Sequence, residues 1–435
     1  MTPFGGNHSC ASRYSLARGF CEVHLKVVGV FLASGKRVGL GCENSERLWK
    51  RLLVGSKIEH ITMERFEPLA MIAMILTICL CLSTPKACSQ ADQGGGVPGF
   101  FIFGDSLVDN GNNNGLLTLA RANYRPYGVD FPQGTTGRFT NGRTFVDVLA
   151  QLLGFRTFIP PYTRTRGRAL LRGANYASGA AGIRDETGNN LGGHVSMNNQ
   201  VENFGRTVEE MSRFFRGDTE ALGCYLSKCI FYSGMGSNDY LNNYFMTDFY
   251  NTKSQYTPQA YASALLEDYS RQLRQLYQFG ARKVVVTGVG MIGCIPYELA
   301  RYQGNSSRCN EEINSAISLF NTGLRKLVDR FNSGRVLPGA KFVYLDTYKS
   351  NIDLIDNAST YGFTVVDKGC CGVGKNNGQI TCLPLQQPCQ DRRGYLFWDA
   401  FHPTQDANIV LAKMAFSSPS RAYAYPINIQ QLAAL

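Results

Sequence analysis

The chain has 435 residues, 44% of them hydrophobic and 18% charged, with a formal net charge of +11. Its basic residues are scattered, and no block of Lys and Arg is interleaved with aromatics. This pattern disfavours a nucleic-acid groove and leaves the charge as a source of solubility or of attraction to an anionic wall or surface. The length would allow two domains, but no Pro/Ser-rich or charged linker divides the chain.

Residues 1–62 carry no sustained periodicity. They are followed by Met63-Glu-Arg65, an apolar stretch over 69–82, and then Pro85 and small residues. A charged lead, a short apolar core and a small-residue exit predict a secretory signal peptide at 63–91. We therefore expect residues 1–62 to be a non-structural extension or a misassigned start, and 92–435 to form a single domain. A signal anchor is the alternative, although the apolar core of about fourteen residues is short for a membrane span.

The cysteines agree with export. Eight of them follow the predicted signal peptide, and an even set in an oxidising compartment predicts disulfides: Cys224, Cys229, Cys294, Cys309, Cys370, Cys371, Cys382 and Cys389. Cys294 and Cys309 would close a short excursion, and the last four would cross-brace one loop. Zinc is the competing interpretation, but no C-x-x-C pair occurs. Asn305 and Asn357 begin N-glycosylation motifs. The chain is thus predicted to be secreted, to the extracellular space or the cell wall.

Four short apolar runs predict buried parallel strands, because they are continuous rather than alternating in polarity. They span 100–103, 229–233, 283–287 and 341–345, and a weaker strand is predicted near 155–159. Segments with helix-start or helix-stop residues lie between or after them, at 144–153, 257–280, 310–332 and 403–416. Strands alternating with helices predict an α/β fold whose parallel sheet is covered on both faces.

The first predicted strand ends in Gly104-Asp105-Ser106. Ligands of parallel α/β sheets bind beyond the carboxyl ends of the strands, so a serine at this turn can present its hydroxyl as a nucleophile. The same tripeptide is also an ordinary turn that caps a helix. The G-x-S-x-G elbow of α/β-hydrolases is absent from the sequence, which disfavours that fold.

Asp399 and His402 stand three residues apart in the segment WDAFHP. A carboxylate in this position can accept a hydrogen bond from the imidazole Nδ1–H and leave Nε2 to take a serine proton. Only His194 and His402 follow the predicted signal peptide, and only His402 has an acidic neighbour. The alternative is a surface loop whose histidine caps the next helix.

Two further segments carry groups that suit an oxyanion. Asn238 follows the strand predicted at 229–233, and its amide can donate to a developing negative charge. The run 175–182, NYASGAAG, has small residues that let backbone N–H groups approach a substrate. Both segments are also compatible with simple turns.

The blocks FIFGDSLVDNGNNN, GANYASGAAGI, GSNDY and YLFWDAFHPT occur in this order over nearly all of residues 100–405. Together they closely resemble the plant GDSL esterase/lipases of the SGNH-hydrolase superfamily. The resemblance implies a flavodoxin-like, three-layer α/β/α sandwich with a central parallel sheet. It does not extend to residues 1–62.

Carried over residue by residue, the resemblance implies that Ser106 is the nucleophile, His402 the base and Asp399 its partner. It implies that Asn238 is an oxyanion donor, together with the backbone N–H of Ser106. Many relatives have glycine where this chain has Ala180, so the N–H of Ala180 or of Gly179 before it is expected to complete the oxyanion site.

The expected reaction is hydrolysis of a lipid or other acyl ester through an acyl-enzyme, with neither metal nor organic cofactor. Residues 239–250 are expected to line the acyl site. We expect a monomer with a small-molecule or lipid ester as its ligand, no nucleic acid, and peripheral contact with a cell wall or lipid surface. Two alternatives remain open: an acyltransferase that uses the same residues, and a non-catalytic wall- or lipid-binding protein.

Overall fold

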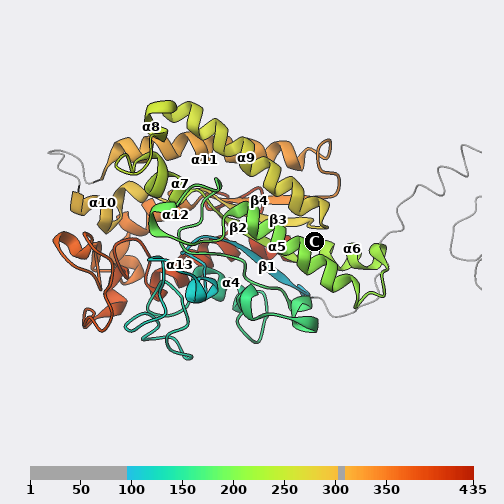
Figure 1. Ribbon diagram of the computed structural model, residues 1–435, viewed down its shortest axis with the longest axis horizontal. Helices are drawn as coiled ribbons and strands as arrows, with labels where there is room; N and C mark the ends of the chain where they lie inside the picture. The colour runs from blue at the N-terminus through green and yellow to red at the C-terminus, as the bar shows by residue number, and fades with distance from the viewer. Residues whose placement is uncertain (1–95, 302–308) are drawn as a thin grey trace, which may run out of the picture. The chain divides into compact units, whose positions relative to one another are not determined.

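A computed structural model describes residues 96–301 and 309–435. The predicted extension, the predicted signal peptide and the Asn305 motif lie outside the described residues. The fold below is that of the unit spanning 86–435. Its centre is a five-stranded sheet in the order β1–β2–β3–β4–β7 (Figure 1). The strands are β1 (Phe100–Gly104), β2 (Ile230–Gly234), β3 (Lys283–Thr287), β4 (Lys341–Leu345) and β7 (Ala424–Tyr425).

Strands β1 to β4 are parallel and pair in register, whereas the short β7 is antiparallel to β4. On the other side of β1, residues 174–178 run parallel to it. Ile102 N–H donates to Ala174 O at 3.0 Å, and Tyr176 N–H donates to Ile102 O at 2.7 Å. With this segment counted as the second strand, the parallel order is 2-1-3-4-5, which is the flavodoxin-like order.

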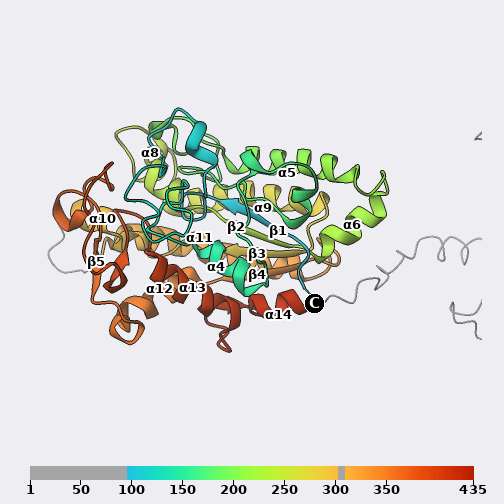
Figure 2. The same ribbon diagram turned by 90° about the horizontal axis from the view of Figure 1, so that it is seen from below.

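Helices cover both faces of the sheet (Figure 2). Alternate residues of each strand point to opposite faces, so Phe101 and Phe103 pack toward α5 (Met197–Ser212), α9 (Pro258–Gln278) and α11 (Glu311–Asn332). Phe100 and Ile102 pack on the opposite side, toward α4 (Phe145–Leu152), α13 (Gln405–Ser417) and α14 (Ile429–Ala434). Because both faces are buried, the strands read as continuous apolar runs.

The predicted helix boundaries agree with the structure. Thr144 caps α4 and forms a capping box with Asp147. Thr257 caps α9, and Pro258 occupies its first helical position. The remaining helices of the described segments are α6 (Thr219–Lys228), α7 (Ser237–Asp239), α8 (Thr252–Gln255), α10 (Pro296–Arg301) and α12 (Thr347–Asp356), besides shorter helical turns. In the described ranges, no helix combines the length and apolarity needed to cross a membrane.

The predicted three-layer α/β/α sandwich is confirmed, and so are its four main strands. The strand predicted at 155–159 is wrong. Phe155 and Ile159 are buried in the packing between helices and sheet, because residues 174–178 already occupy the edge of the sheet next to β1. An apolar run alone does not distinguish these two kinds of burial.

A second, two-stranded sheet pairs β5 (Val365–Gly369) with β6 (Tyr395–Phe397). The loop between these strands carries two disulfides, Cys370–Cys389 and Cys371–Cys382, and a third disulfide joins Cys294 to Cys309. The prediction that Cys294 pairs with Cys309 is therefore confirmed. So is the prediction that the last four cysteines form disulfides within one loop. The prediction that Cys229 also forms a disulfide is wrong. It is a free thiol, buried just before β2.

The loop that follows β1 is fastened to α4 by a buried ion pair. Arg138 and Asp147 are 4% and 3% exposed. The Arg138 guanidinium donates two hydrogen bonds, of 2.7 and 2.8 Å, to the Asp147 carboxylate. The same carboxylate accepts the backbone N–H of Thr144. Loss of the arginine would leave a buried and unpaired negative charge next to the cap of α4.

We predict that Arg138→Ala lowers the free energy of unfolding by about 3–5 kcal/mol, measured by urea denaturation. Arg392 offers a matched control, because it also donates two hydrogen bonds of 2.7 Å to an aspartate, Asp130. The Arg392 side chain, however, is 32% exposed. Arg392→Ala should cost no more than about 1 kcal/mol. Equal losses in the two variants would contradict this ranking.

Candidate active site

Ser106 lies at the carboxyl end of β1, in a turn that the sequence GDS imposes. The Asp105 carboxylate accepts the N–H of Leu107 at 2.9 Å, and its backbone carbonyl accepts the N–H groups of Val108 and Asp109. A β-carbon at Gly104 would lie 2.5 Å from Cγ2 of Val108, so the tight approach of the turn requires glycine. Ser106 therefore lies just beyond the carboxyl end of β1, next to β2, where parallel α/β sheets bind their ligands.

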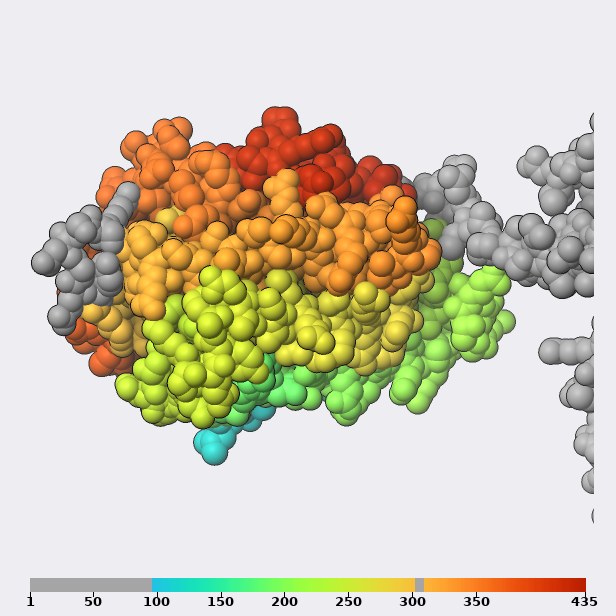
Figure 3. Space-filling model, turned by 90° about the horizontal axis from the view of Figure 1, so that it is seen from above, coloured from blue at the N-terminus to red at the C-terminus, as the bar shows by residue number. Residues whose placement is uncertain are grey.

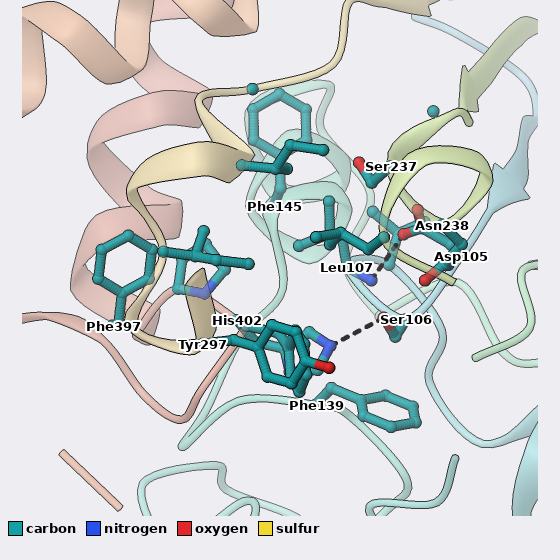
Figure 4. A pocket seen from close by; sticks show the side chains of 18 of the residues that line it. Asp105, Ser106, Leu107, Phe139, Phe145, Ser237, Asn238, Tyr297, Phe397 and His402 are labelled. Atoms are coloured by element: carbon teal, nitrogen blue, oxygen red, sulfur yellow. Dashed lines mark hydrogen bonds between the residues drawn. The ribbon is translucent and has the colours of Figure 1, made fainter. Parts of the chain in front are cut away.

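The structure brings Ser106, His402 and Asp399 together. Nε2 of His402 lies 2.8 Å from Oγ of Ser106, across 296 residues of sequence (Figure 4). On the other side of the imidazole, Nδ1 lies 2.8 and 2.9 Å from the two carboxylate oxygens of Asp399. With Nδ1 donating to the carboxylate, Nε2 is free to accept the serine proton.

The carboxylate of Asp399 is fully buried and held by further donors. The backbone N–H groups of Phe401 and His402 reach Oδ1 at 2.9 and 2.8 Å. Burial opposes ionisation of Asp399, but His402 and the surrounding hydrogen bonds outweigh it and hold the pKa of the carboxyl below its ordinary value. The group facing the imidazole is therefore an anion.

Two donors to Asp399 escaped the sequence analysis. The hydroxyl of Tyr127 lies 2.5 Å from Oδ2, and that of Thr381 lies 3.1 Å from the same atom. Burial and the neighbouring Asp399 raise the pKa of Tyr127 well above its usual range, so the phenol stays protonated and acts as a donor. Tyr127 belongs to the loop after β1 and Thr381 to the disulfide-braced loop, and neither stands in a recognisable motif.

The disulfide-braced loop positions the acid as well as supplying Thr381. The N–H groups of Cys370 and Cys371 donate to Phe397 O and Trp398 O, at 3.0 and 2.7 Å, just before Asp399. The two disulfides therefore anchor the backbone that leads into the Asp399–His402 turn.

Asn238 lies in α7, the short helical segment that follows β2, and is 7% exposed. Its Oδ1 accepts a hydrogen bond from Asn242 at 2.7 Å, and its Nδ2 donates to Ala181 O at 3.0 Å. This network fixes the orientation of the amide and leaves Nδ2 one further hydrogen to donate. Asn238 lines the same cavity as Ser106 and His402 (Figure 4).

Of the two backbone donors predicted at this position, the structure disfavours Gly179. Its N–H is already used, because it donates to the carboxylate of Asp109 at 3.0 Å. Ala180 lines the cavity with Ser106, and its N–H has no acceptor among the described residues. Ala180 adopts φ 68°, a left-handed conformation that glycine adopts more readily than alanine. Of the two candidates, only the Ala180 N–H is free to meet a ligand.

A cavity of about 610 Å³ opens beside Ser106. Its lining includes Met235, Thr287 and Leu345 at the carboxyl ends of β2, β3 and β4, and Ala415 on α13. Leu241, Asn242 and Met246 also line it, as predicted for residues 239–250, whereas Tyr240 and Tyr244 are buried in the core instead. His194, the other candidate base, is not among the lining residues.

The carboxyl group of Asp105 is buried and forms no ion pair within the described residues. Burial raises its pKa from 3.8 to about 6, although the N–H of Leu107 and the nearby His402 oppose this shift. The folded protein therefore holds this proton more tightly than the unfolded chain does. The resulting contribution to stability is complete below about pH 4 and is lost as the pH rises through about 6.

We predict that Asp105→Asn gains stability relative to the unsubstituted protein as the pH rises. The reason is that the asparagine amide never ionises, whereas the buried carboxyl group of Asp105 does. Relative to the unsubstituted protein, its free energy of unfolding should gain up to roughly 2–3 kcal/mol between pH 4 and pH 7.5. Urea denaturation at several pH values measures this difference. The exposed Asp356→Asn serves as control, and a pH-independent difference for Asp105→Asn would refute the assignment.

Comparisons with known proteins identify relatives of the chain. The family model described as GDSL-like lipase/acylhydrolase matches residues 100–414. GDSL esterase/lipase At1g33811 of Arabidopsis thaliana is 70% identical over 350 residues, covering 80% of this chain and 94% of that protein. GDSL esterase/lipase At5g45670 of the same plant is 53% identical, covering 84% of this chain and 98% of that protein. GDSL esterase/lipase 7, also from this plant, is 48% identical, with 78% and 92% covered.

Proposed function

Because the chain belongs to the GDSL-like lipase/acylhydrolase family, a family of hydrolases, we propose that it hydrolyses carboxylic esters through an acyl-enzyme on Ser106. The observation that carries this proposal is the alignment of Ser106 Oγ, His402 and Asp399 through hydrogen bonds of 2.8 to 2.9 Å. The resemblance to plant GDSL esterase/lipases is confirmed at the level of the family.

In the first half-reaction, Ser106 Oγ attacks the ester carbonyl carbon while Nε2 of His402 takes the hydroxyl proton. The imidazolium that forms is stabilised by the Asp399 carboxylate. His402 then passes the proton to the departing alkoxide, and the alcohol leaves. In the second half-reaction, His402 removes a proton from water, which attacks the acyl carbon and releases the acid and the free serine.

The negative charge on the carbonyl oxygen needs donors that are already in place. We assign this role to the backbone N–H groups of Ser106 and Ala180 and to the amide of Asn238. All three residues line the cavity, and the amide is held by Asn242. The mechanism needs no metal ion or organic cofactor.

The nucleophile is tested by Ser106→Ala, which should lower kcat by about 10⁴-fold or more. His402→Ala should cause a similar loss, because the serine is a weak nucleophile without its base. Release of nitrophenol from a nitrophenyl ester measures both, and the unfolding midpoint shows that the variants are folded. Turnover close to that of the unsubstituted protein in either variant would contradict the proposal.

The oxyanion donors are tested by Asn238→Ala, which should lower kcat by about 10²–10³-fold with little change in KM. Ala180→Gly keeps the backbone N–H and relieves the left-handed conformation, so it should retain activity and gain roughly 1 kcal/mol in stability. A loss of activity in Ala180→Gly comparable with that in Asn238→Ala would argue against a backbone donor at this position.

The cavity indicates the class of ester. Its volume of about 610 Å³ and its apolar lining, including Met235, Ile295 and Leu411, suit an extended acyl chain better than a polar group. We assign the part of the cavity that is lined by Leu345, Leu411 and Ala415 to the acyl group. The alcohol part would then lie toward the open mouth.

This assignment predicts that kcat/KM rises with acyl length in a nitrophenyl ester series. Each methylene that enters the cavity should contribute about two- to fourfold. Ala415→Leu fills part of the cavity on the side of α13, so it should lower kcat/KM for long chains and leave the acetate ester unaffected. A uniform loss across the series would show that Ala415 does not face the acyl chain.

We also infer export from the cell. The predicted signal peptide motivates this inference, and the three disulfides within the described residues support it, because such bonds persist in oxidising compartments. Asn357 is exposed, as a glycosylation acceptor must be.

A further inference from the structure

Large apolar side chains are exposed in two loops of the molecule. Of the eleven that are exposed among the described residues, seven lie in residues 107–119 and 373–385. Single exposed leucines are ordinary, but a cluster of them marks a surface that meets something apolar. We call five of these residues the apolar rim: Leu117, Leu119, Ile380, Leu383 and Leu385, with exposed fractions of 94, 79, 51, 43 and 82%.

The apolar rim stands at the mouth of the cavity. Leu119, Ile380 and Leu383 line the same cavity as Ser106 and His402. The two loops are also joined to each other, because Leu385 N–H donates to Arg125 O and the Tyr124 hydroxyl donates to Cys382 O, both at 2.8 Å. Figure 1 shows both loops beyond the carboxyl ends of the strands, and the cyan part of the first loop projects from the surface in Figure 3.

Backbone conformation sets Leu385 apart. Its φ is 63°, in the left-handed region that bulky side chains rarely adopt, and its side chain is nevertheless 82% exposed. Neither burial nor local backbone preference accounts for a leucine here. Such strain is retained where the surrounding structure enforces it, and it often marks a functional position. The disulfides Cys370–Cys389 and Cys371–Cys382 supply that enforcement.

The charges near the apolar rim have one sign. Residues 110–129 and 370–390 contain Arg121, Arg125 and Lys375, all exposed, and no Asp or Glu. Among acidic residues of neighbouring segments, Asp130 pairs with Arg392 and Glu186 with Arg184. Asp367 and Asp391 are exposed in the flanking segments, each with a basic residue, Lys368 or Arg393, within two positions. The two stretches at the mouth therefore present exposed leucines together with positive charge.

We propose that the apolar rim docks onto an anionic lipid surface, so that an ester leaves the lipid layer directly into the cavity. The leucines insert among the acyl chains, while Arg125 and Lys375 meet anionic headgroups. The disulfide-braced loop holds its leucines exposed in water, so docking needs no rearrangement. This inference rests on the proposed function only in taking the cavity mouth as the route of the substrate.

The test measures binding of the full chain to vesicles by co-sedimentation, in a Ser106→Ala background so that no lipid is consumed. The vesicles contain phosphatidylcholine, with or without phosphatidylglycerol. The double variant Leu117→Ser/Leu385→Ser should bind about 100-fold more weakly to both, since each leucine contributes about tenfold. Leu435→Ser is the matched control, because Leu435 is 66% exposed but lies at the other end of the sheet, and it should bind normally.

A second variant, Arg125→Gln/Lys375→Gln, separates charge from insertion. It should lose about fivefold per charge on vesicles with phosphatidylglycerol and nothing on pure phosphatidylcholine. Neither Leu117 nor Leu385 lines the cavity, so with Ser106 restored their variants should hydrolyse a water-soluble acetate ester at the normal rate. The proposal would be overturned if the Ser106→Ala protein with an intact apolar rim did not bind the vesicles. It would also be overturned if Leu117→Ser/Leu385→Ser and Leu435→Ser bound equally well. Failure of the esterase proposal would appear separately, as hydrolysis that survives Ser106→Ala.

Discussion

The hydrogen bonds around Asp399 are the constraint on which the site depends. A carboxylate that is completely removed from water is costly unless every lone pair is matched, and five donors meet it here. Three come from its own turn, through the backbone of Phe401 and His402 and the imidazole, and the other two are the hydroxyls of Tyr127 and Thr381. Their result is an imidazole held in one orientation, with its free nitrogen on Ser106.

These donors connect parts of the chain that are far apart in sequence. Tyr127 comes from the loop that Arg138 fastens to α4, and Thr381 comes from the loop that two disulfides close. The loops that orient the acid therefore also carry the apolar rim. The ion pair and disulfides that fix the donors around Asp399 thus belong to the same two loops that expose Leu117 and Leu385.

The parts of this arrangement that follow local rules could be predicted from the sequence. Continuous apolar runs identified β1 to β4, and cap residues such as Thr144 and Thr257 identified helix starts. Ser106, Asn238 and the Asp399–His402 pair stood out because each follows a strand or carries a titratable partner at short spacing. Their meeting in space follows from parallel topology, since the carboxyl ends of neighbouring strands share one edge.

The rest depends on contacts that no local pattern encodes. Residues 174–178 run along β1 although they form no continuous apolar run, and Phe155 is buried without pairing in the sheet. Gly179 and Ala180 are adjacent, and only the distant Asp109 carboxylate decides which of their N–H groups is occupied. Tyr127 and Thr381 are ordinary loop residues until the fold places them on Asp399.

The most direct measurement of the central claim is covalent labelling with a serine-directed fluorophosphonate, followed by mass spectrometry of the peptides. Attack by an activated serine on phosphorus displaces fluoride and leaves a stable adduct. The account predicts one adduct, on the peptide that contains Ser106, and its loss in His402→Ala. An adduct on another serine, or labelling of Ser106 that persists without His402, would contradict it.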